Sequence, residues 1–145
     1  MGTEENKATM LRITNEVFNK GNVSAIDELV AADFVDHATP PGVPGTRDAL
    51  KGFVTMYRAA FPDLHITLKA VIAEGDKVVQ YATVSGTMKG DFAGMTASGK
   101  SATWDEIHIS RIANGKNAEH WMVTDQMSML AQLGFVQAPG QPVPA

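Results

Sequence analysis

The segment Ala59-Ala60-Phe61-Pro62-Asp63-Leu64 is the point at which the periodicity of the 145-residue chain changes. Before it, apolar residues recur at helical spacing, and the last helical pattern runs from Thr46, a predicted N-cap, to Pro62, because proline does not continue a helix. After it, β-branched residues become frequent, and the pattern predicts strands at 64–73, 78–87, 101–112 and 117–124. Helices followed by a run of strands indicate an α+β domain with the helices on one face of an antiparallel sheet.

Two shorter helical patterns and one strand precede Thr46. The first helix is predicted to begin at the N-cap Thr3 and to end at Lys20-Gly21, where glycine can adopt a left-handed conformation. A weak capping box at Ser24 predicts a short second helix, and the residues at 34–37 predict a short strand. Together with the helix before Pro62, these patterns predict three N-terminal helices.

Composition and charge narrow the functional classes. Twelve Lys and Arg against sixteen Asp and Glu give a formal net charge of −4, so the domain lacks the excess of basic residues that favours phosphate binding, and no nucleic-acid partner is expected. The absence of cysteine excludes disulfides, thiolate nucleophiles and thiolate-bound metals. No apolar run approaches the roughly 20 residues of a membrane span, and the polar N-terminus is unlike a signal peptide, so a cytoplasmic protein is expected. One domain is expected over 1–137, followed by a loose proline-rich tail at 138–145.

Several short sequence segments between about residue 5 and Gly134 have a characteristic order and spacing. They are Asp33-Phe34-Val35-Asp36-His37, Ala59-Ala60-Phe61-Pro62-Asp63-Leu64, Ala73-Glu74-Gly75-Asp76-Lys77-Val78-Val79, Ser85-Gly86-Thr87, Gly90-Asp91-Phe92-Ala93-Gly94, Asn114-Gly115-Lys116 and Glu119-His120-Trp121. Their order and spacing resemble those of the SnoaL-like polyketide cyclases. The resemblance implies the cone-shaped barrel of the nuclear-transport-factor-two-like superfamily, in which a strongly curved, mostly antiparallel sheet wraps around three N-terminal helices and a short C-terminal helix follows. It also implies one deep pocket for a small apolar molecule and a homodimer formed through the sheets.

The resemblance further implies a type of chemistry. Characterised members of this family close a ring in a polyketide ester by intramolecular aldol condensation, without a metal or cofactor. Their acid/base group is an Asp directly after the pair matched by His120-Trp121, and this chain has Met122 at that position. A thioether cannot take a proton from carbon. Met88 likewise stands two residues after Gly86, where the family often has His.

Other side chains in the second half of the chain can carry acid/base chemistry. Proton abstraction next to a carbonyl needs a base tuned towards neutral pH, a donor for the developing oxyanion and a dry pocket. Trp104, Glu106 and His108 share one face of a predicted strand, and His120 lies on the next strand. We therefore predict that His120, together with Glu106 or Asp125, transfers the proton.

Each of these residues also has a purely structural explanation. His120 can be a hydrogen-bonded core histidine. Glu106 is a surface residue if it lies on the outer face of the sheet, whereas a buried carboxylate needs partners. Asp125 begins a short helix predicted to run through Leu130 and to end by Gly134, so N-capping is its simpler explanation.

The remaining candidates would shape the binding pocket. His37 ends the first predicted strand near the expected pocket mouth, and the glycine-rich segment 90–99 is predicted to form a rim or lid loop. No two histidines have His-x-His or His-x3-His spacing, so no metal site is predicted. The predicted substrate-binding residues are His37, Tyr57, Phe61, Met88, Phe92, Trp104, His108 and Met122.

Two functions of different classes fit these residues. The first is an enzyme that performs cofactor-independent acid/base chemistry, an aldol-type cyclisation or an isomerisation, on an apolar carbonyl compound. The second is a non-catalytic carrier or sensor of an apolar metabolite, which the absence of the family Asp at Met122 favours. An epoxide hydrolase is disfavoured because it needs an Asp-Arg-Asp network, and Arg111 has the opposite strand parity from Glu106 and His108. Hydrogen-bond contact between Glu106 and His120 inside one cavity would favour the enzyme.

Overall fold

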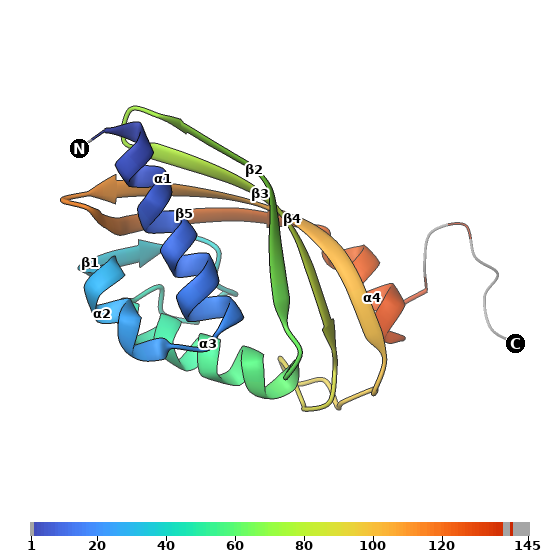
Figure 1. The fold of residues 1–145 in the computed structure, drawn as a ribbon. Coiled ribbons are helices and arrows are strands. Elements are labelled where there is room, and N and C mark those ends of the chain that lie inside the picture. The colour runs from blue at the N-terminus through green and yellow to red at the C-terminus, as the bar shows by residue number, and fades with distance from the viewer. Residues whose placement is uncertain (1, 138–139, 141–145) are drawn as a thin grey trace, which may run out of the picture.

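Figure 1 shows a curved sheet with helices α1, α2 and α3 on its concave side and helix α4 beside the far end of β4. The computed structural model describes residues 2–137 and 140. The elements in chain order are α1 (Thr3–Arg12), the π-helical η1 (Ile13–Asn19), the 3-10 helix η2 (Val23–Ala25), α2 (Ile26–Leu29), β1 (Val30–Asp36), α3 (Arg47–Ala60), β2 (His65–Glu74), β3 (Lys77–Thr87), β4 (Ser101–Ala113), β5 (Lys116–Thr124) and α4 (Gln126–Leu133). The predicted tail at 138–145 lies outside the described residues except for Gly140.

The sheet contains five strands in the order β1-β5-β4-β3-β2. All neighbouring strands are antiparallel except β1, which runs parallel to β5. The turns that join β2 to β3 and β4 to β5 contain residues with a positive φ, namely Gly75, Asn114 and Gly115, and such residues are typical of tight hairpins. The predicted α+β class with a mostly antiparallel sheet is confirmed.

Strands β2, β3 and β4 bend strongly along their length (Figure 1). The pairing register shifts between Leu68 and Ala70 in the β2–β3 pair and between Arg111 and Ile112 in the β4–β5 pair. Irregularities of this kind bend a strand and increase its twist. The bend creates the concave face on which the N-terminal helices pack.

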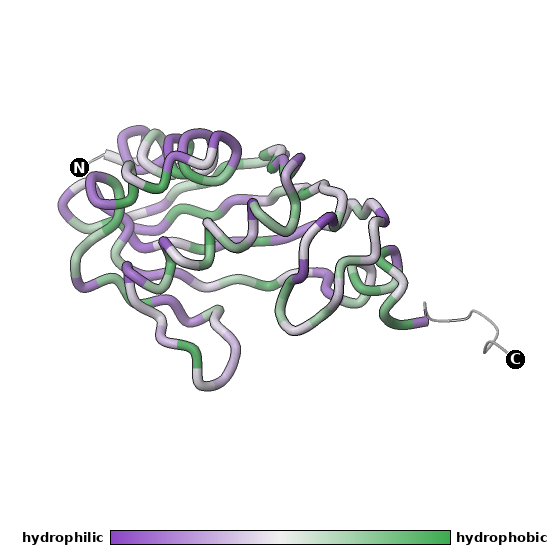
Figure 2. Tube along the Cα trace, turned by 90° about the horizontal axis from the view of Figure 1, so that it is seen from below, coloured by the Kyte–Doolittle hydropathy of each residue, from purple (hydrophilic) through white to green (hydrophobic). Residues whose placement is uncertain are grey.

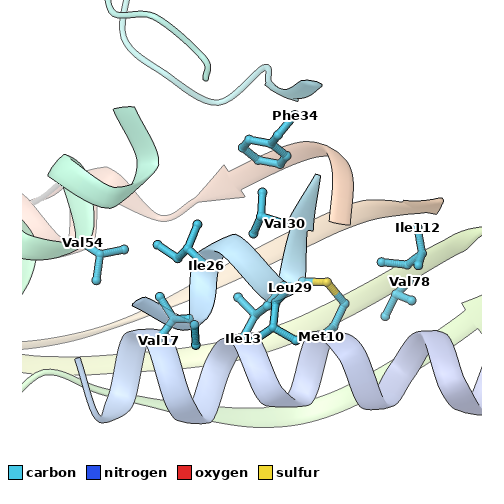
Figure 3. Packing of buried hydrophobic residues seen from close by; sticks show 11 residues of the cluster. Met10, Ile13, Val17, Ile26, Leu29, Val30, Phe34, Val54, Val78 and Ile112 are labelled. Atoms are coloured by element: carbon cyan, nitrogen blue, oxygen red, sulfur yellow. The ribbon is translucent and has the colours of Figure 1, made fainter. Parts of the chain in front are cut away.

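A buried apolar cluster joins the helices to one end of the sheet. Met10, Ile13 and Val17 lie on one side of the N-terminal helix and point towards Ile26 and Leu29 (Figure 3). In Figure 2 the same helix has hydrophilic residues on its outer side and hydrophobic residues towards the sheet, as an amphipathic surface helix requires. The other buried members of this cluster are Ala25, Val30, Phe34, Val54, Val78 and Ile112.

Two predicted starts of elements are wrong. Gly2, not Thr3, is the N-cap of α1, because the main-chain N–H of Asn6 donates to the carbonyl of Gly2 at 3.1 Å and places Thr3 inside the first turn. Strand β1 begins at Val30 rather than at residue 34, because Val30 already pairs with Asn117 of β5. This pairing is long-range, and the local pattern contains no sign of it.

Of two further predicted helix N-terminal caps, one is confirmed and one is wrong. The predicted N-cap Thr46 is confirmed, since its hydroxyl accepts a hydrogen bond from the N–H of Ala49 at 3.2 Å. The predicted capping box at Ser24 is wrong: its hydroxyl donates to Oδ1 of Asn22 at 2.7 Å, and the segment begins as a 3-10 helix. Among the described residues, no helix is long and apolar enough to cross a membrane.

Candidate functional site

The concave faces of β4 and β5 carry a row of side chains that includes two histidines, a serine and Met122. Ser110 of β4 pairs with His120 of β5, and His108 pairs with Met122, so these four side chains share one face. Ser110 is fully buried, and His108 and His120 are mostly buried. Because the helices pack on this side of the sheet, the row lies inside the cone.

Four titratable side chains on this face form one continuous series of hydrogen bonds. Oδ1 of Asp36 lies 2.9 Å from Nδ1 of His120, and Nε2 of His120 lies 2.9 Å from Nδ1 of His108. Nε2 of His108 lies 2.9 Å from Oε1 of Glu106. We refer to Asp36, His120, His108 and Glu106 as the histidine network. It links a carboxylate on β1 to a carboxylate on β4 through two imidazoles.

Glu106 forms one end of the network and is saturated with donors. Its Oε2 accepts hydrogen bonds from Nε1 of Trp104 at 2.9 Å and from the hydroxyl of Thr124 at 3.2 Å. Burial raises the pKa of the Glu106 carboxyl, whereas the hydrogen bond and charge of His108 lower it, and with the other donors the net shift is downward. The side chain is only 11% exposed, so Glu106 is a buried carboxylate that its partners keep ionised at neutral pH.

Asp36 forms the opposite end, where β1 ends. Its Oδ1 also accepts a hydrogen bond from the N–H of Ala38 at 2.9 Å, and its own N–H donates to the carbonyl of Gly45. Burial raises the pKa of the Asp36 carboxyl, whereas the hydrogen bond and charge of His120 lower it, and with the N–H of Ala38 and the charge of His108 the net shift is downward. Both ends of the network are therefore anionic at neutral pH.

An aromatic wall adjoins the Glu106 end. The ring of Phe61 lies 5.6 Å from Tyr57 and 6.0 Å from Trp104, measured between centroids. Phe92 lies 5.3 Å from Tyr57 and 5.7 Å from Phe61, and Met88 is fully buried in the same cluster. The structure thus brings these five predicted substrate-binding residues into one apolar cluster, which Trp104 joins to Glu106 by its hydrogen bond.

Tyr57 is the phenol of this wall. Burial, followed by the negative charge of Glu106, raises the pKa of Tyr57 well above its usual value. Tyr57 is 8% exposed, and its hydroxyl forms no hydrogen bond with the part of the chain that the structure describes. It is therefore a neutral donor whose hydrogen is free for a bound molecule.

Two of the predicted titratable site residues, Asp125 and His37, do not join the network. Oδ1 of Asp125 accepts a hydrogen bond from the N–H of Ser128 at 3.2 Å, and Asp125 is the N-cap of α4. Nε2 of His37 lies 2.6 Å from Oε2 of Glu119, and its ring stacks on Trp121 at 5.1 Å between centroids. Trp121 and Glu119 have the opposite strand parity from His120, so these contacts lie on the outer side of β5.

The residues missed by sequence reasoning are Asp36 and Thr124. Asp36 meets His120 because β1 and β5 pair in parallel, although 84 positions separate the two residues. One local signal was available for Asp36, which shares its parity with the apolar and buried Phe34. Thr124 has the same strand parity as His120, which places both side chains on the same face of β5.

Two further features concern a possible metal site and a possible ligand pocket. Within residues 2–137, no three His, Asp or Glu side chains are arranged to hold a metal ion. A pocket of about 360 Å³ lies at the hairpin ends, away from the predicted site residues. It is lined by Asn6, Gly75, Asp76, Ile112, Asn114 and Gly115.

Solved structures share this fold. TsrD from Streptomyces laurentii is 25% identical to this chain, with a TM-score of 0.86, and the match covers 94% of this chain and 99% of that one. IdmH from Streptomyces antibioticus is 31% identical, with a TM-score of 0.77, over 89% of this chain and 98% of that one. The fold and the histidine network together define a cone-shaped α+β protein with a polar site on its concave face.

The family follows from the sequence match. Residues 8–133 match the family model of the SnoaL-like polyketide cyclases, and the chain belongs to that family. The nogalonic acid methyl ester cyclase of Streptomyces nogalater is 29% identical over 119 residues, which are 81% of this chain and 89% of that protein. The resemblance carried by the short segments is confirmed.

Proposed function

We propose that this protein is a cofactor-independent acid/base catalyst that closes a ring in, or isomerises, an apolar carbonyl compound of the polyketide type. The observation that carries the proposal is the histidine network next to the aromatic wall. Imidazoles are the side chains best suited to proton transfer near neutral pH. A largely hydrophobic substrate would bind against the part of the wall that is not fully buried, at Tyr57 and Phe92.

The proposed reaction balances without an external reagent. An imidazole of the pair His108 and His120 takes a proton from the carbon next to a carbonyl, and the phenol of Tyr57 donates a hydrogen bond to the resulting enolate oxygen. The enolate carbon then forms a bond to a second carbonyl carbon of the same molecule. The imidazolium returns its proton to the new alkoxide, so the product is an isomer of the substrate.

The relatives suggest the substrate class. Three curated relatives carry the names nogalonic or aklanonic acid methyl ester cyclase. We extend from these names to a polyketide methyl ester as the first substrate to test. Because Met122 occupies the position where the family has its Asp, the histidine pair takes over the role of the base in this proposal.

Turnover by the purified chain tests the proposal. Aklanonic acid methyl ester and nogalonic acid methyl ester are incubated with the wild type, and isomeric products are separated by chromatography with mass detection. We expect conversion by the wild type and a loss of about 10²- to 10⁴-fold for His120→Ala. The matched control is Asp105→Asn, which removes a carboxylate from the opposite face of β4. An unchanged rate for His120→Ala overturns the mechanism.

A carrier or sensor is the second candidate. One observation favours it: every ring nitrogen of His108 and His120 already has a partner inside the network. A thermal-shift screen with the same esters distinguishes the two functions. Tight binding with no isomerised product over a panel of polyketide esters establishes the carrier, whereas product formation establishes the enzyme.

A further inference from the structure

The hydrogen bonds of the histidine network determine how many ring hydrogens the two imidazoles must carry. Each hydrogen bond between two heavy atoms needs one hydrogen. The carboxylates of Asp36 and Glu106 are ionised and can only accept, so Nδ1 of His120 and Nε2 of His108 must each carry a hydrogen. These two hydrogens are all that a pair of neutral imidazoles possesses.

The central contact needs one hydrogen more. Nε2 of His120 and Nδ1 of His108 lie 2.9 Å apart, which is hydrogen-bond distance. Without a hydrogen between them, two lone pairs would face each other, and with two, two N–H groups would collide. The observed distance therefore fits a pair that carries three ring hydrogens and a single positive charge between two carboxylates.

We propose that Asp36, His120, His108 and Glu106 hold three ring protons as one unit, and that the third proton, shared by the two imidazoles, is the one exchanged with the substrate. This inference rests on the proposed function and specifies its acid/base group. His108 and His120 are the catalytic residues in this scheme. Asp36 and Glu106 are positioning residues, which act through the imidazoles and do not touch the substrate.

Loss of the third proton makes one imidazole nitrogen available to a ligand. When it leaves Nε2 of His120, the hydrogen bond to Nδ1 of His108 is lost, and one basic nitrogen becomes free to face a ligand. That nitrogen takes a proton from the substrate carbon, which restores three ring protons and the positive charge. The proton then moves to the product alkoxide, so the number of protons and the charge balance over one cycle.

The surrounding charges favour the third proton. Asp36 on β1 and Glu106 on β4 flank the imidazoles as two anions. From α3 the titratable neighbour is Tyr57, which is neutral because its pKa is raised by burial and by Glu106. On the outer side of β5, the charge of Glu119 is paired with Arg111 at 2.9 Å, and Glu119 also forms a hydrogen bond with His37. Removing either flanking anion should make the pair release its third proton at lower pH.

Nitrogen-15 NMR of the full chain, labelled at histidine, tests the proposal without any substrate. We expect the signals of His108 and His120 to titrate together, with one proton lost from the pair in a single step. Glu106→Gln and Asp36→Asn should each move that step to lower pH, because each removes an anion beside the imidazoles. Asp105→Asn, with the same charge change on the outer face of β4, should leave it in place.

Two outcomes overturn the proposal. One is a pair of independent titrations, such that His108→Gln leaves the titration of His120 unchanged. The other is an equal effect of Asp105→Asn and Glu106→Gln, which would reflect net charge alone. If Asp36→Asn fails to fold, the wild-type titration and Glu106→Gln still decide the matter.

The same measurement separates this proposal from the proposed function. Independent titration together with a loss of turnover in His120→Ala would retain the enzyme and remove the shared proton. If the two histidines share a proton but the protein only binds esters and converts none, the shared proton is retained and the proposed enzyme is removed.

Discussion

His108 and His120 face each other diagonally across β4 and β5, with Nδ1 of His108 2.9 Å from Nε2 of His120. Their rings are 22° from parallel, and their centroids lie 5.1 Å apart. A diagonal pair on one face of an antiparallel sheet is within reach of long and aromatic side chains. The contact links two residues that are 12 positions apart by one hydrogen bond inside the cone.

Replacing His108 by Phe tests how much this contact stabilises the fold. A planar aromatic ring is kept, although phenyl is larger than imidazole, and Oε1 of Glu106 and Nε2 of His120 lose their partner. An unsatisfied buried polar group costs about 1–3 kcal/mol, more where it is charged, so we expect the free energy of unfolding to fall by at least this amount in urea titrations. His65→Phe, at an exposed position of β2, should change it by less than about 0.5 kcal/mol. Equal effects of the two substitutions would contradict the prediction.

The pH dependence of stability follows from the two lowered carboxyl pKa values. A carboxylate whose folded pKa is depressed contributes stability above its unfolded pKa, and this contribution is lost as pH falls through the folded value. For Glu106 and Asp36, whose unfolded pKa values are near 4.5 and 3.8, the free energy of unfolding should therefore fall as the pH drops below about 5. Glu106→Gln resembles the protonated form, so its stability should start lower and decline less steeply. Urea unfolding at a series of pH values measures the slope, and an unchanged slope in Glu106→Gln contradicts the assignment.

Alanine substitutions at two separate glycines, Gly86 and Gly52, test the packing of the aromatic wall. A Cβ at Gly86 would lie 2.9 Å from Cδ1 and 3.2 Å from Cβ of Phe61, which is fully buried. Overpacking of this kind costs about 1–3 kcal/mol, so Gly86→Ala should lower the free energy of unfolding by that amount. The control is Gly52→Ala on α3, where a Cβ meets nothing within 4 Å. Alanine there should stabilise the helix by about 0.5–1 kcal/mol, so the two substitutions should have opposite signs.

The fold was largely accessible from the sequence because its signals are local. The change of period at Pro62 and the Asn114-Gly115 turn separate the helices from the strands, and the predicted strand 78–87 differs from β3 by one residue. Strand β1 was half missed, since its hydrogen bonds go to β5 at the other end of the chain. Local periodicity contains no information on which strands will pair in parallel.

The candidate site was accessible only in part for the same reason. Strand parity alone placed Trp104, Glu106 and His108 on one face, and the structure has both Trp104 and His108 hydrogen-bonded to Glu106. Asp36 escaped notice as a partner of His120 because their contact depends on tertiary pairing. Whether these residues catalyse a reaction stays a prediction, to be decided by turnover.

The outer face of the sheet carries an exposed apolar row that leads to a prediction about assembly. Tyr81, Ile107 and Val123 pair in register across β3, β4 and β5, and Val123 is 76% exposed. Exposed apolar patches of this kind mark interfaces, and homodimer interfaces are the most apolar. We propose that a second copy of this chain covers the row, as the resemblance to the SnoaL-like cyclases also implies.

Sedimentation measurements on charge variants test this assembly. Ile107→Lys combined with Val123→Lys places two cations in the proposed interface, where unpaired charges are costly to bury, so the variant should sediment as a monomer at concentrations at which the wild type is a dimer. Val43→Lys changes another valine, 48% exposed, in the loop before α3, and should leave the dimer intact. A monomeric wild type, or dissociation by Val43→Lys as well, removes the sheet face as the interface. Because the histidine network lies on the opposite face of the same strands, a monomeric double variant should keep the turnover of the wild type.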